Sequence, residues 1–327
     1  MRRRELITLA AGALAWPVAA RAQRERAQRI AVMMTNAADD PEGLARVTAF
    51  RQGLRELGWV EGQNLQIDWY WSGGDIGRIH ANAAEVAASA PDLAVANGSV
   101  NLSALLQAAR TIPIVFVLVN DPAGQKFVAS LAHPGGNVTG YALTEPAMFG
   151  KSLELLKQLA PAVSHVGFLY NPETSPYYAG YLPALQSAAR AHGVAAREVH
   201  VRNETEMESA VTALSAESGG LIVPPDTYTL TRRGPIIRSA REHKVPAIYA
   251  YRQIAREGGL LAYGPDAADI FWRSASYVDR ILKGASPAEL PVQAPAKFEL
   301  AINMATASAL GLTVPPTLSA LADEVIE

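Results

Sequence analysis

Polar side chains stand directly after apolar, strand-like runs in the first half of this chain, and they are candidates for ligand binding. They are Asn36, Asn97, Ser99, Asn101 and Asp121. Ligands of open α/β sheets bind beyond the carboxyl ends of the strands, where such residues lie. Residues 97–103 also open a helical segment, whose free backbone N–H groups suit a carboxylate without an arginine. Asp121 is suited to accept from an ammonium group. Helix capping and Asp-Pro turn chemistry are the alternative explanations.

The second half carries a parallel set of polar and aromatic residues after its own strand-like runs. They are Tyr170, Asn171, Asp226, Tyr228 and Tyr249. A tyrosine at a strand end can stack on a flat ligand while a nearby hydroxyl or amide hydrogen-bonds it. The alternative is that these tyrosines pack between lobes or lie on the surface. Together the two sets predict a ligand site shared by both halves of the chain.

The sequence lacks the motifs of common catalytic and metal sites. It contains no phosphate-binding loop, no G-x-S-x-G nucleophile elbow and no H-E-x-x-H zinc motif. Its six histidines are scattered without a pair at metal-ligand spacing, and cysteine is absent. We therefore expect a binding protein without a cofactor or metal, rather than an enzyme.

Short β-branched runs alternate with longer segments of helical apolar spacing, which is typical of parallel sheets with crossover helices. The expected strands are 30–34, 65–71, 93–96, 112–119, 138–143, 165–170, 197–201, 221–223, 246–250 and 260–263. The expected helices are 47–57, 76–89, 147–160, 177–192, 205–217, 229–243, 267–283 and 304–310. A chain of 327 residues exceeds what one hydrophobic core usually serves. The sequence thus predicts an α/β protein with two lobes and a cleft.

The first 22 residues have the character of an export signal. Three arginines precede an apolar run at 6–20, and Ala20-Arg21-Ala22 offers small residues at signal-peptidase spacing. The run is shorter than the roughly 20 apolar residues that span a bilayer. We expect cleavage before Gln23 and a location in the periplasm. The Sec and twin-arginine routes both stay open, because Arg3-Arg4 also fits the twin-arginine pattern.

Net charge and composition limit the classes of partner that this protein can bind. The formal net charge of −2 includes the signal, whose four arginines and one glutamate contribute +3, so the mature chain carries −5. Nucleic-acid binding calls for basic patches, and we expect no nucleic-acid partner. The absence of cysteine also excludes the lipid anchor of an exported lipoprotein. A free soluble protein is the expectation.

Eight short segments between Arg29 and Glu327, taken together, carry a resemblance to a known family. They are Phe50-Arg51-Gln52-Gly53-Leu54, Gly58-Trp59-Val60-Glu61-Gly62-Gln63-Asn64, Thr111-Ile112-Pro113-Ile114-Val115-Phe116, Pro134-Gly135-Gly136-Asn137-Val138-Thr139-Gly140, Arg280-Ile281-Leu282-Lys283-Gly284, Leu290-Pro291-Val292-Gln293, Lys297-Phe298-Glu299-Leu300-Ala301-Ile302-Asn303 and Ala322-Asp323-Glu324-Val325-Ile326. With them the chain resembles the substrate-binding components of ABC transporters, in the group that includes tryptophan and other aromatic amino acid binders.

The resemblance implies a type I periplasmic binding protein fold, with two αβα Rossmann-like lobes and a three-segment hinge. It implies an N-terminal lobe of 29–144 plus 262–292 and a C-terminal lobe of 145–261 plus 293–327. It also implies a carboxylate site at the strand-to-helix junction, here residues 97–103. This chain has Asn97, Val100 and Asn101 there, in place of the commoner small, threonine-containing loop.

We therefore expect a periplasmic solute-binding protein of an ABC importer that acts as a monomer. It would capture a small carboxylate-bearing ligand, an amino acid or aromatic acid, and deliver it to an inner-membrane permease. The first-half residues would bind the ligand and the second-half residues would close over it. The alternative is a periplasmic sensory protein that presents the same closed form to a receptor or kinase.

Overall fold

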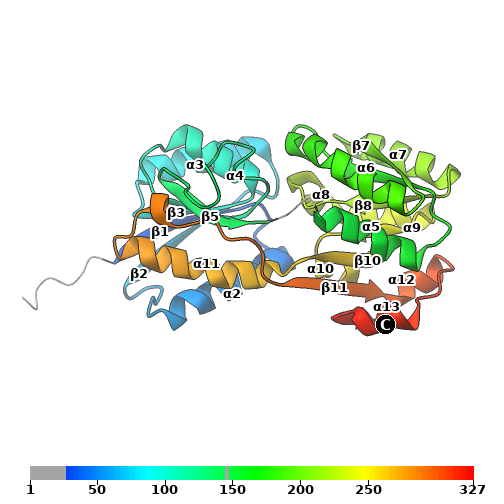
Figure 1. The fold of residues 1–327 in the computed structure, drawn as a ribbon. Helices are drawn as coiled ribbons and strands as arrows, with labels where there is room; N and C mark the ends of the chain where they lie inside the picture. The colour runs from blue at the N-terminus through cyan, green and yellow to red at the C-terminus, as the bar shows by residue number, and fades with distance from the viewer. Residues whose placement is uncertain (1–26, 144–146) are drawn as a thin grey trace, which may run out of the picture.

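The computed structural model describes residues 27–143 and 147–327, which form two α/β lobes side by side (Figure 1). Within these residues the first lobe holds a five-stranded sheet and the second a seven-stranded sheet. Most neighbouring strands run parallel, so the predicted α/β class is confirmed. The expected export signal and its cleavage site before Gln23 lie outside the described residues.

The first sheet has the order β2-β1-β3-β4-β5. Its strands are β1 (Gln28–Met34), β2 (Leu65–Trp71), β3 (Leu93–Asn97), β4 (Ile114–Val119) and β5 (Val138–Ala142). Helices α3 (Ile76–Ser89) and α4 (Ser99–Ala108) cover one face, and α2 (Pro41–Glu56) and α11 (Ala267–Leu282) cover the other (Figure 1). Because both faces are covered, β3 and β4 are apolar and buried along almost their whole length.

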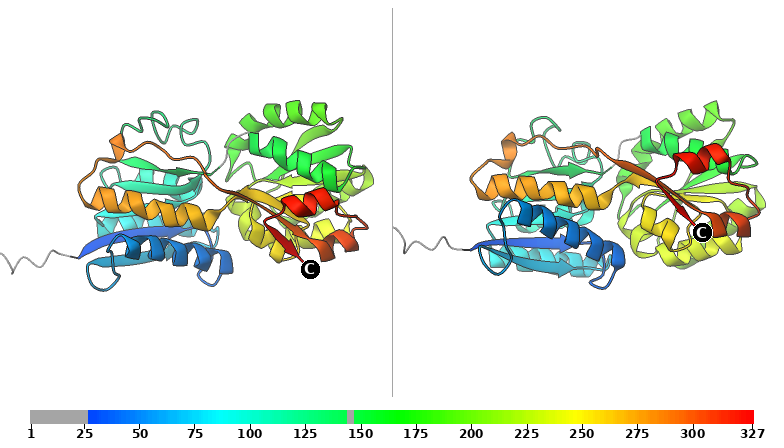
Figure 2. Two further views of the ribbon diagram at one scale, coloured as in Figure 1. Left: turned by 60° about the horizontal axis from the view of Figure 1, so that its bottom comes forward. Right: turned by 90° about the horizontal axis from the view of Figure 1, so that it is seen from below.

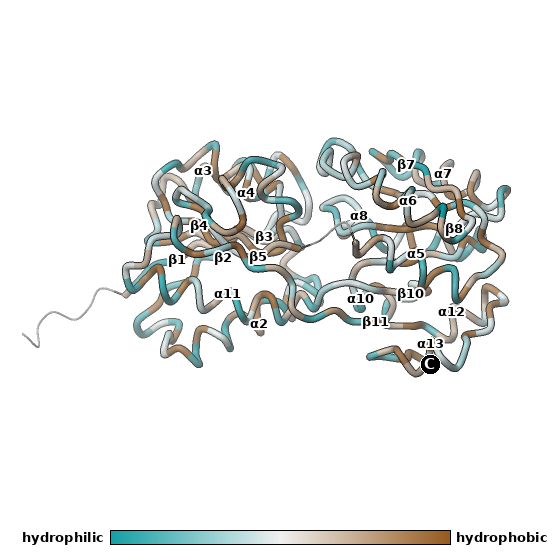
Figure 3. The backbone as a smooth tube through the Cα atoms, in the orientation of Figure 1, coloured by the Kyte–Doolittle hydropathy of each residue, from teal (hydrophilic) through white to brown (hydrophobic). Residues whose placement is uncertain are grey.

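The second sheet has the order β12-β11-β10-β9-β8-β6-β7. Its strands are β6 (His165–Tyr170), β7 (Ala195–His200), β8 (Gly219–Val223), β9 (Ala247–Tyr249), β10 (Leu261–Pro265), β11 (Phe298–Asn303) and β12 (Glu324–Ile326). On one face lie α5 (Ala147–Leu159) and α6 (Leu182–Ala191), and on the other α7 (Glu204–Ala216) and α9 (Arg233–Glu242). Figure 3 shows apolar residues along the strands of both lobes and polar residues at the outer turns.

Short helices complete the second lobe and the connection back to it. They are η1 (Pro176–Tyr181), α8 (Thr227–Thr231), α10 (Arg252–Arg256), η2 (Pro287–Glu289), α12 (Met304–Ala309) and α13 (Pro316–Leu321). No sequence pattern predicted α10, α13 or β12. Single helices were expected at 177–192 and 229–243, where the structure has η1 followed by α6 and α8 followed by α9.

The chain passes between the lobes after β5, after β10 and after η2 (Figure 1). The sequence placed the second passage near residue 262. The structure moves it to after Pro265, because β10 pairs with β9 and β11 inside the second sheet. Helix α11 then returns to the first lobe and packs on α2.

The helices α2 and α11 lie side by side against the first sheet (Figure 2) and pack tightly at Gly53. A Cβ atom at this position would lie 2.4 Å from the carbonyl oxygen of Trp272 and 2.9 Å from the Cβ of Ala275. In the same interface the rings of Phe50 and Phe271 meet edge to face at 6.4 Å. This packing fixes the returning helix to the first lobe.

We expect Gly53→Ala to destabilise the protein by about 1–3 kcal/mol, because the added methyl group must push the two helices apart. The matched control is Gly180→Ala in η1, where a Cβ would meet nothing within 4 Å. That change should be neutral or slightly stabilising, since alanine restricts the unfolded chain. Urea unfolding of both variants measures the difference. Equal stabilities would show that α2 and α11 have room to separate.

Candidate ligand-binding site

The carboxyl ends of β1, β3 and β4 point toward the second lobe, and a small cavity lies there between the lobes. Its volume is about 30 Å³, which admits water molecules but no amino acid. The first lobe contributes Thr35, Arg46, Asn97, Gly98, Ser99 and Asn120 among others. The second lobe contributes Tyr177, Asp226, Leu230 and Tyr251 among others. In this conformation the lobes are closed on each other.

Helix α4 begins at the edge of this cavity. Its N-cap is Gly98, whose φ of 85° favours glycine, and no side chain of the described residues caps the helix. In the first backbone hydrogen bond of the helix, Leu102 N donates to Gly98 O at 3.1 Å. The amides of Ser99, Val100 and Asn101 precede that hydrogen bond and have no capping side chain among the described residues. The helix dipole reinforces the attraction for a carboxylate at this point.

The side chains of Asn97 and Asn101 tie the strand ends together beneath the cavity. Asn97 Oδ1 accepts from Thr35 N at 3.3 Å, and Asn101 Nδ2 donates to Asn97 O at 2.7 Å. Asn101 Nδ2 also lies 3.1 Å from Thr35 Oγ1, which it can donate to. Ser99 lines the cavity, and its hydroxyl accepts from Gln125 Nε2 at 3.2 Å. Asn97 and Asn101 therefore hold β1 in place against β3 where helix α4 begins.

Arg46 lines the cavity and was not among the residues predicted from the sequence. The side chain is only 1% exposed, and its guanidinium carbon lies 4.9 Å from the centre of the Tyr251 ring in the other lobe. Its Nε donates to Glu42 Oε1 at 3.1 Å, and its Nη1 donates to Asn36 Oδ1 at 3.4 Å. Its position was a sequence signal for the site, because Arg46 lies next to Val47 on the buried side of α2. Charged side chains are almost never fully buried unless they are paired or functional.

Asp226 is the buried acid on the opposite wall. Its Oδ2 accepts from Asn171 N at 2.9 Å, and its Oδ1 accepts from Thr174 Oγ1 at 2.6 Å and from Tyr228 N at 2.9 Å. Burial raises the pKa of its carboxyl, and these hydrogen bonds only partly oppose the rise. A cation from a ligand would restore the charged form.

Asn120 and Tyr177 join the two walls directly. Asn120 Nδ2 lies 3.0 Å from Tyr177 OH and 3.3 Å from Pro225 O, both in the second lobe. Burial raises the pKa of Tyr177 above its usual value, so its hydroxyl stays protonated. The neutral hydroxyl can both donate and accept in the cavity.

Of the ten predicted site residues, Asn97, Ser99 and Asp226 line the cavity, whereas Asp121, Tyr170 and Tyr249 line neither the cavity nor the larger groove beside it. Asp121 lies in a turn, where its Oδ1 accepts from Gly124 N at 2.9 Å. Tyr170 packs on Phe168 and Tyr178 in the second lobe, and its OH donates to Glu198 Oε1 at 2.8 Å. Tyr249 is 2% exposed in the apolar core. Side chains of successive strand residues point to opposite faces, and these two tyrosines point into the sheet packing.

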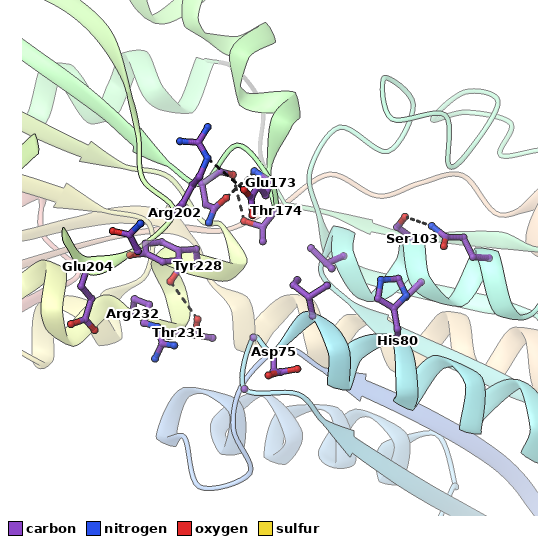
Figure 4. A pocket seen from close by; sticks show the side chains of 18 residues that line it. Asp75, His80, Ser103, Glu173, Thr174, Arg202, Glu204, Tyr228, Thr231 and Arg232 are labelled. Atoms are coloured by element: carbon purple, nitrogen blue, oxygen red, sulfur yellow. Dashed lines mark hydrogen bonds and ion pairs between the residues drawn. The ribbon is translucent and has the colours of Figure 1, made fainter. Parts of the chain in front are cut away.

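Asn171 and Tyr228 line a larger groove between the same lobes, with a volume of about 790 Å³ (Figure 4). Asp75, His80 and Ser103 face it from the first lobe. Helices α4 and α8 contribute residues to both this groove and the cavity. The groove therefore forms the mouth of the cleft. Asn36 lies on the inner side, fully buried behind Arg46.

An ion pair holds the two lobes together outside the cavity. Asp40, the N-cap of α2, lies 2.8 Å from Arg233 of α9, and both side chains are nearly buried. Arg233 is also bidentate to Glu257, at 2.6 and 3.0 Å. Burial alone would raise the pKa of Asp40, but Arg233 and the helix amides outweigh it and hold that pKa below its usual value. This pair exists only while the lobes are closed.

Comparison with known proteins identifies the family. Residues 30–326 match the model of the ABC transporter substrate binding proteins. The chain belongs to this family. It is a family of substrate-binding proteins rather than enzymes, which confirms the resemblance seen in the sequence. Among the described residues, no helix combines the length and apolar character needed to cross a membrane.

The relatives include amino acid binders. A tyrosine-binding protein of Clostridioides difficile (strain R20291) is 27% identical over 264 residues, which cover 80% of this chain and 75% of that protein. A conserved domain protein of Vibrio cholerae is 29% identical, with a TM-score of 0.84 over 92% of this chain and 100% of that one. The fold agrees with that of type I periplasmic binding proteins, as predicted.

Two further structures bear on the arrangement of the lobes. An ABC domain from Streptococcus pneumonia in complex with L-Trp is 26% identical and aligns with a TM-score of 0.83 over 91% of this chain and 99% of that one. The ligand-free, open structure of a substrate binding protein with adhesive properties from Clostridium difficile is 25% identical but aligns at only 0.68, over the same shares. At similar identities, the chain therefore aligns better with the ligand-bound relative than with the open one.

We expect removal of the ion pair between the lobes to shift the protein toward an open form. Asp40→Asn keeps an oxygen for capping α2 but loses the charge that faces Arg233. The control is Arg256→Met, which breaks a pair with Glu324 inside the second lobe. Small-angle scattering should show a larger radius of gyration for Asp40→Asn only. A radius unchanged from that of the parent would mean that the pair does not hold the lobes.

The same pair predicts a dependence on pH. The pKa of Asp40 is lower in the closed form than its ordinary value of 3.8, so the pair stabilises the closed form fully above that value. The stabilisation is lost as pH falls through the lowered pKa. Scattering between pH 7 and pH 3 should therefore show acid opening that is weaker in Asp40→Asn. Identical profiles would contradict this assignment.

Proposed function

We propose that this protein is exported to the periplasm, captures an aromatic amino acid there and delivers it to an ABC permease of the inner membrane. The family membership, the amino acid binders among its relatives and the signal-like first 22 residues support the proposal. The observation that carries it is the pairing of the free N-terminus of α4 with the buried Asp226 across one cavity.

The two walls suit the two charged ends of an amino acid. The open amides of Ser99, Val100 and Asn101 would bind the α-carboxylate, as helix N-termini bind anions elsewhere. Asp226 would accept from the α-ammonium group, whose charge offsets the cost of the buried carboxylate. Tyr177 and Tyr251 would contact the aromatic ring, together with the apolar side chains beside them.

Binding would proceed by opening and closing of the lobes. The cavity of about 30 Å³ must enlarge before a ligand enters, and the groove beside α4 and α8 is its route. Contacts to both lobes then favour the closed form, because a ligand shifts an equilibrium only by its differential affinity. The permease would recognise the closed form that the ligand stabilises.

Calorimetry on the chain from Gln23 tests the ligand class. We expect binding of L-tyrosine, L-phenylalanine or L-tryptophan and no binding of glucose or adenosine. At a hundred times the dissociation constant the ligand should add about 2.7 kcal/mol to the free energy of unfolding. Binding confined to glucose or adenosine would overturn the proposed chemistry.

Asp226→Asn tests the ammonium site in the same assay. The change should weaken binding of the amino acid by about 10- to 100-fold, because a hydrogen bond to a charged group is lost. The matched ligand control is 3-phenylpropionate, which has the ring and carboxylate of phenylalanine but no amine. Its affinity should not fall in Asp226→Asn. An equal loss for both ligands would assign Asp226 a purely structural role. Uptake of the labelled amino acid by cells with and without the gene tests delivery to the permease.

A further inference from the structure

Two buried donors lie side by side without an aligned acceptor, one on Arg46, which lines the cavity, and one on Asn36 behind it. Arg46 Nη2 and Asn36 Nδ2 make no hydrogen bond to any described residue, although both side chains are at most 1% exposed. They are adjacent, because Arg46 Nη1 donates to Asn36 Oδ1. Buried polar groups without partners are rare in native proteins and call for an explanation.

The neighbours of Arg46 do not use its whole donor set. Glu42 Oε1 lies 3.1 Å from both Nε and Nη2, but only the Nε contact has hydrogen-bond geometry. A guanidinium group has five N–H donors and no acceptor. The Tyr251 ring covers one face of the group and its hydroxyl also interacts with Arg46, which leaves Nη2 as the donor without an aligned acceptor. Arg46 lines the ligand cavity itself.

We propose that the ligand carries an acceptor oxygen on its side chain and that Arg46, held by Asn36, recognises it. This inference rests on the proposed function and adds the chemistry of the ligand side chain to it. With the carboxylate at α4 and the ammonium group at Asp226, the free donor of Arg46 is left for the distal end of the ligand. Among aromatic amino acids the phenolic oxygen of tyrosine meets this requirement. Phenylalanine has no polar atom there, and the indole N–H of tryptophan is a donor only.

Sites built to hydrogen-bond a ligand hydroxyl discriminate strongly against analogues that lack it. The reason is that the analogue leaves the buried donors unpaired after the lobes have closed over them. We therefore expect L-tyrosine to bind at least about tenfold more tightly than L-phenylalanine and L-tryptophan.

The rival arrangement places the α-carboxylate on Arg46 and leaves the distal end of the ligand without a polar partner. The two arrangements predict different effects of one substitution on two ligands. In our arrangement Arg46→Met weakens tyrosine binding to the level of phenylalanine and leaves phenylalanine unchanged. In the rival arrangement it weakens both ligands by the same factor.

The experiment is a calorimetric titration of L-tyrosine, L-phenylalanine and L-tryptophan into the parent, Arg46→Met and Arg46→Lys. Because Arg46→Met leaves Glu42 without its partner, the double variant Glu42→Gln with Arg46→Met is included, and Glu42→Gln alone is the control. Thermal unfolding of each variant verifies that it is folded. Arg46→Lys keeps the charge without the planar fork and should recover part of the preference for tyrosine.

The expected result is a preference for tyrosine in the parent and in Glu42→Gln that disappears in both Arg46→Met variants. Equal affinity of the parent for tyrosine and phenylalanine would overturn the inference and leave the proposed function intact. An equal loss for both ligands in Arg46→Met would overturn it in favour of the rival arrangement. Binding of none of the three amino acids would overturn the proposed function, and the inference with it.

Discussion

Three passages of the chain between the lobes determine how the rest of this structure can move. They follow β5, β10 and η2, so each lobe is completed by a segment that has first visited the other. Helix α11 is fixed to α2 by the close approach at Gly53, and β11 is paired with β10. Relative motion is therefore confined to the connecting segments, as in hinge-closing proteins. The polar residues at the strand ends lie on the side where the lobes meet.

The long elements could be predicted from the sequence because their burial is recorded locally. A strand covered on both faces, such as β4, is a continuous apolar run, and α3 shows its buried side at helical spacing. The short elements could not, because they depend on partners far away in the chain. β12 exists through pairing of Val325 with Ile302, which no local pattern encodes.

Part of the candidate site was also predictable, because local sequence patterns show where strands end. Strand ends are visible in a sequence, and Asn97, Ser99 and Asp226 do lie at the cavity. The face to which a strand-end side chain points is less visible, and Tyr170 and Tyr249, which were expected at the ligand, pack inside the second lobe. Arg46 was not predicted because the apolar face expected for this helix began at Val47, whereas α2 begins at Pro41 after its Asp40 cap.

The small cavity of the closed form has a kinetic consequence. A space of about 30 Å³ cannot admit an amino acid, so every productive encounter must occur with a molecule whose lobes are already apart. The observed association rate is then the intrinsic rate multiplied by the open fraction. The apparent dissociation constant rises by the inverse of that fraction. Contacts such as Asn120 to Tyr177, which hold the lobes together without ligand, thus slow capture while they also slow release.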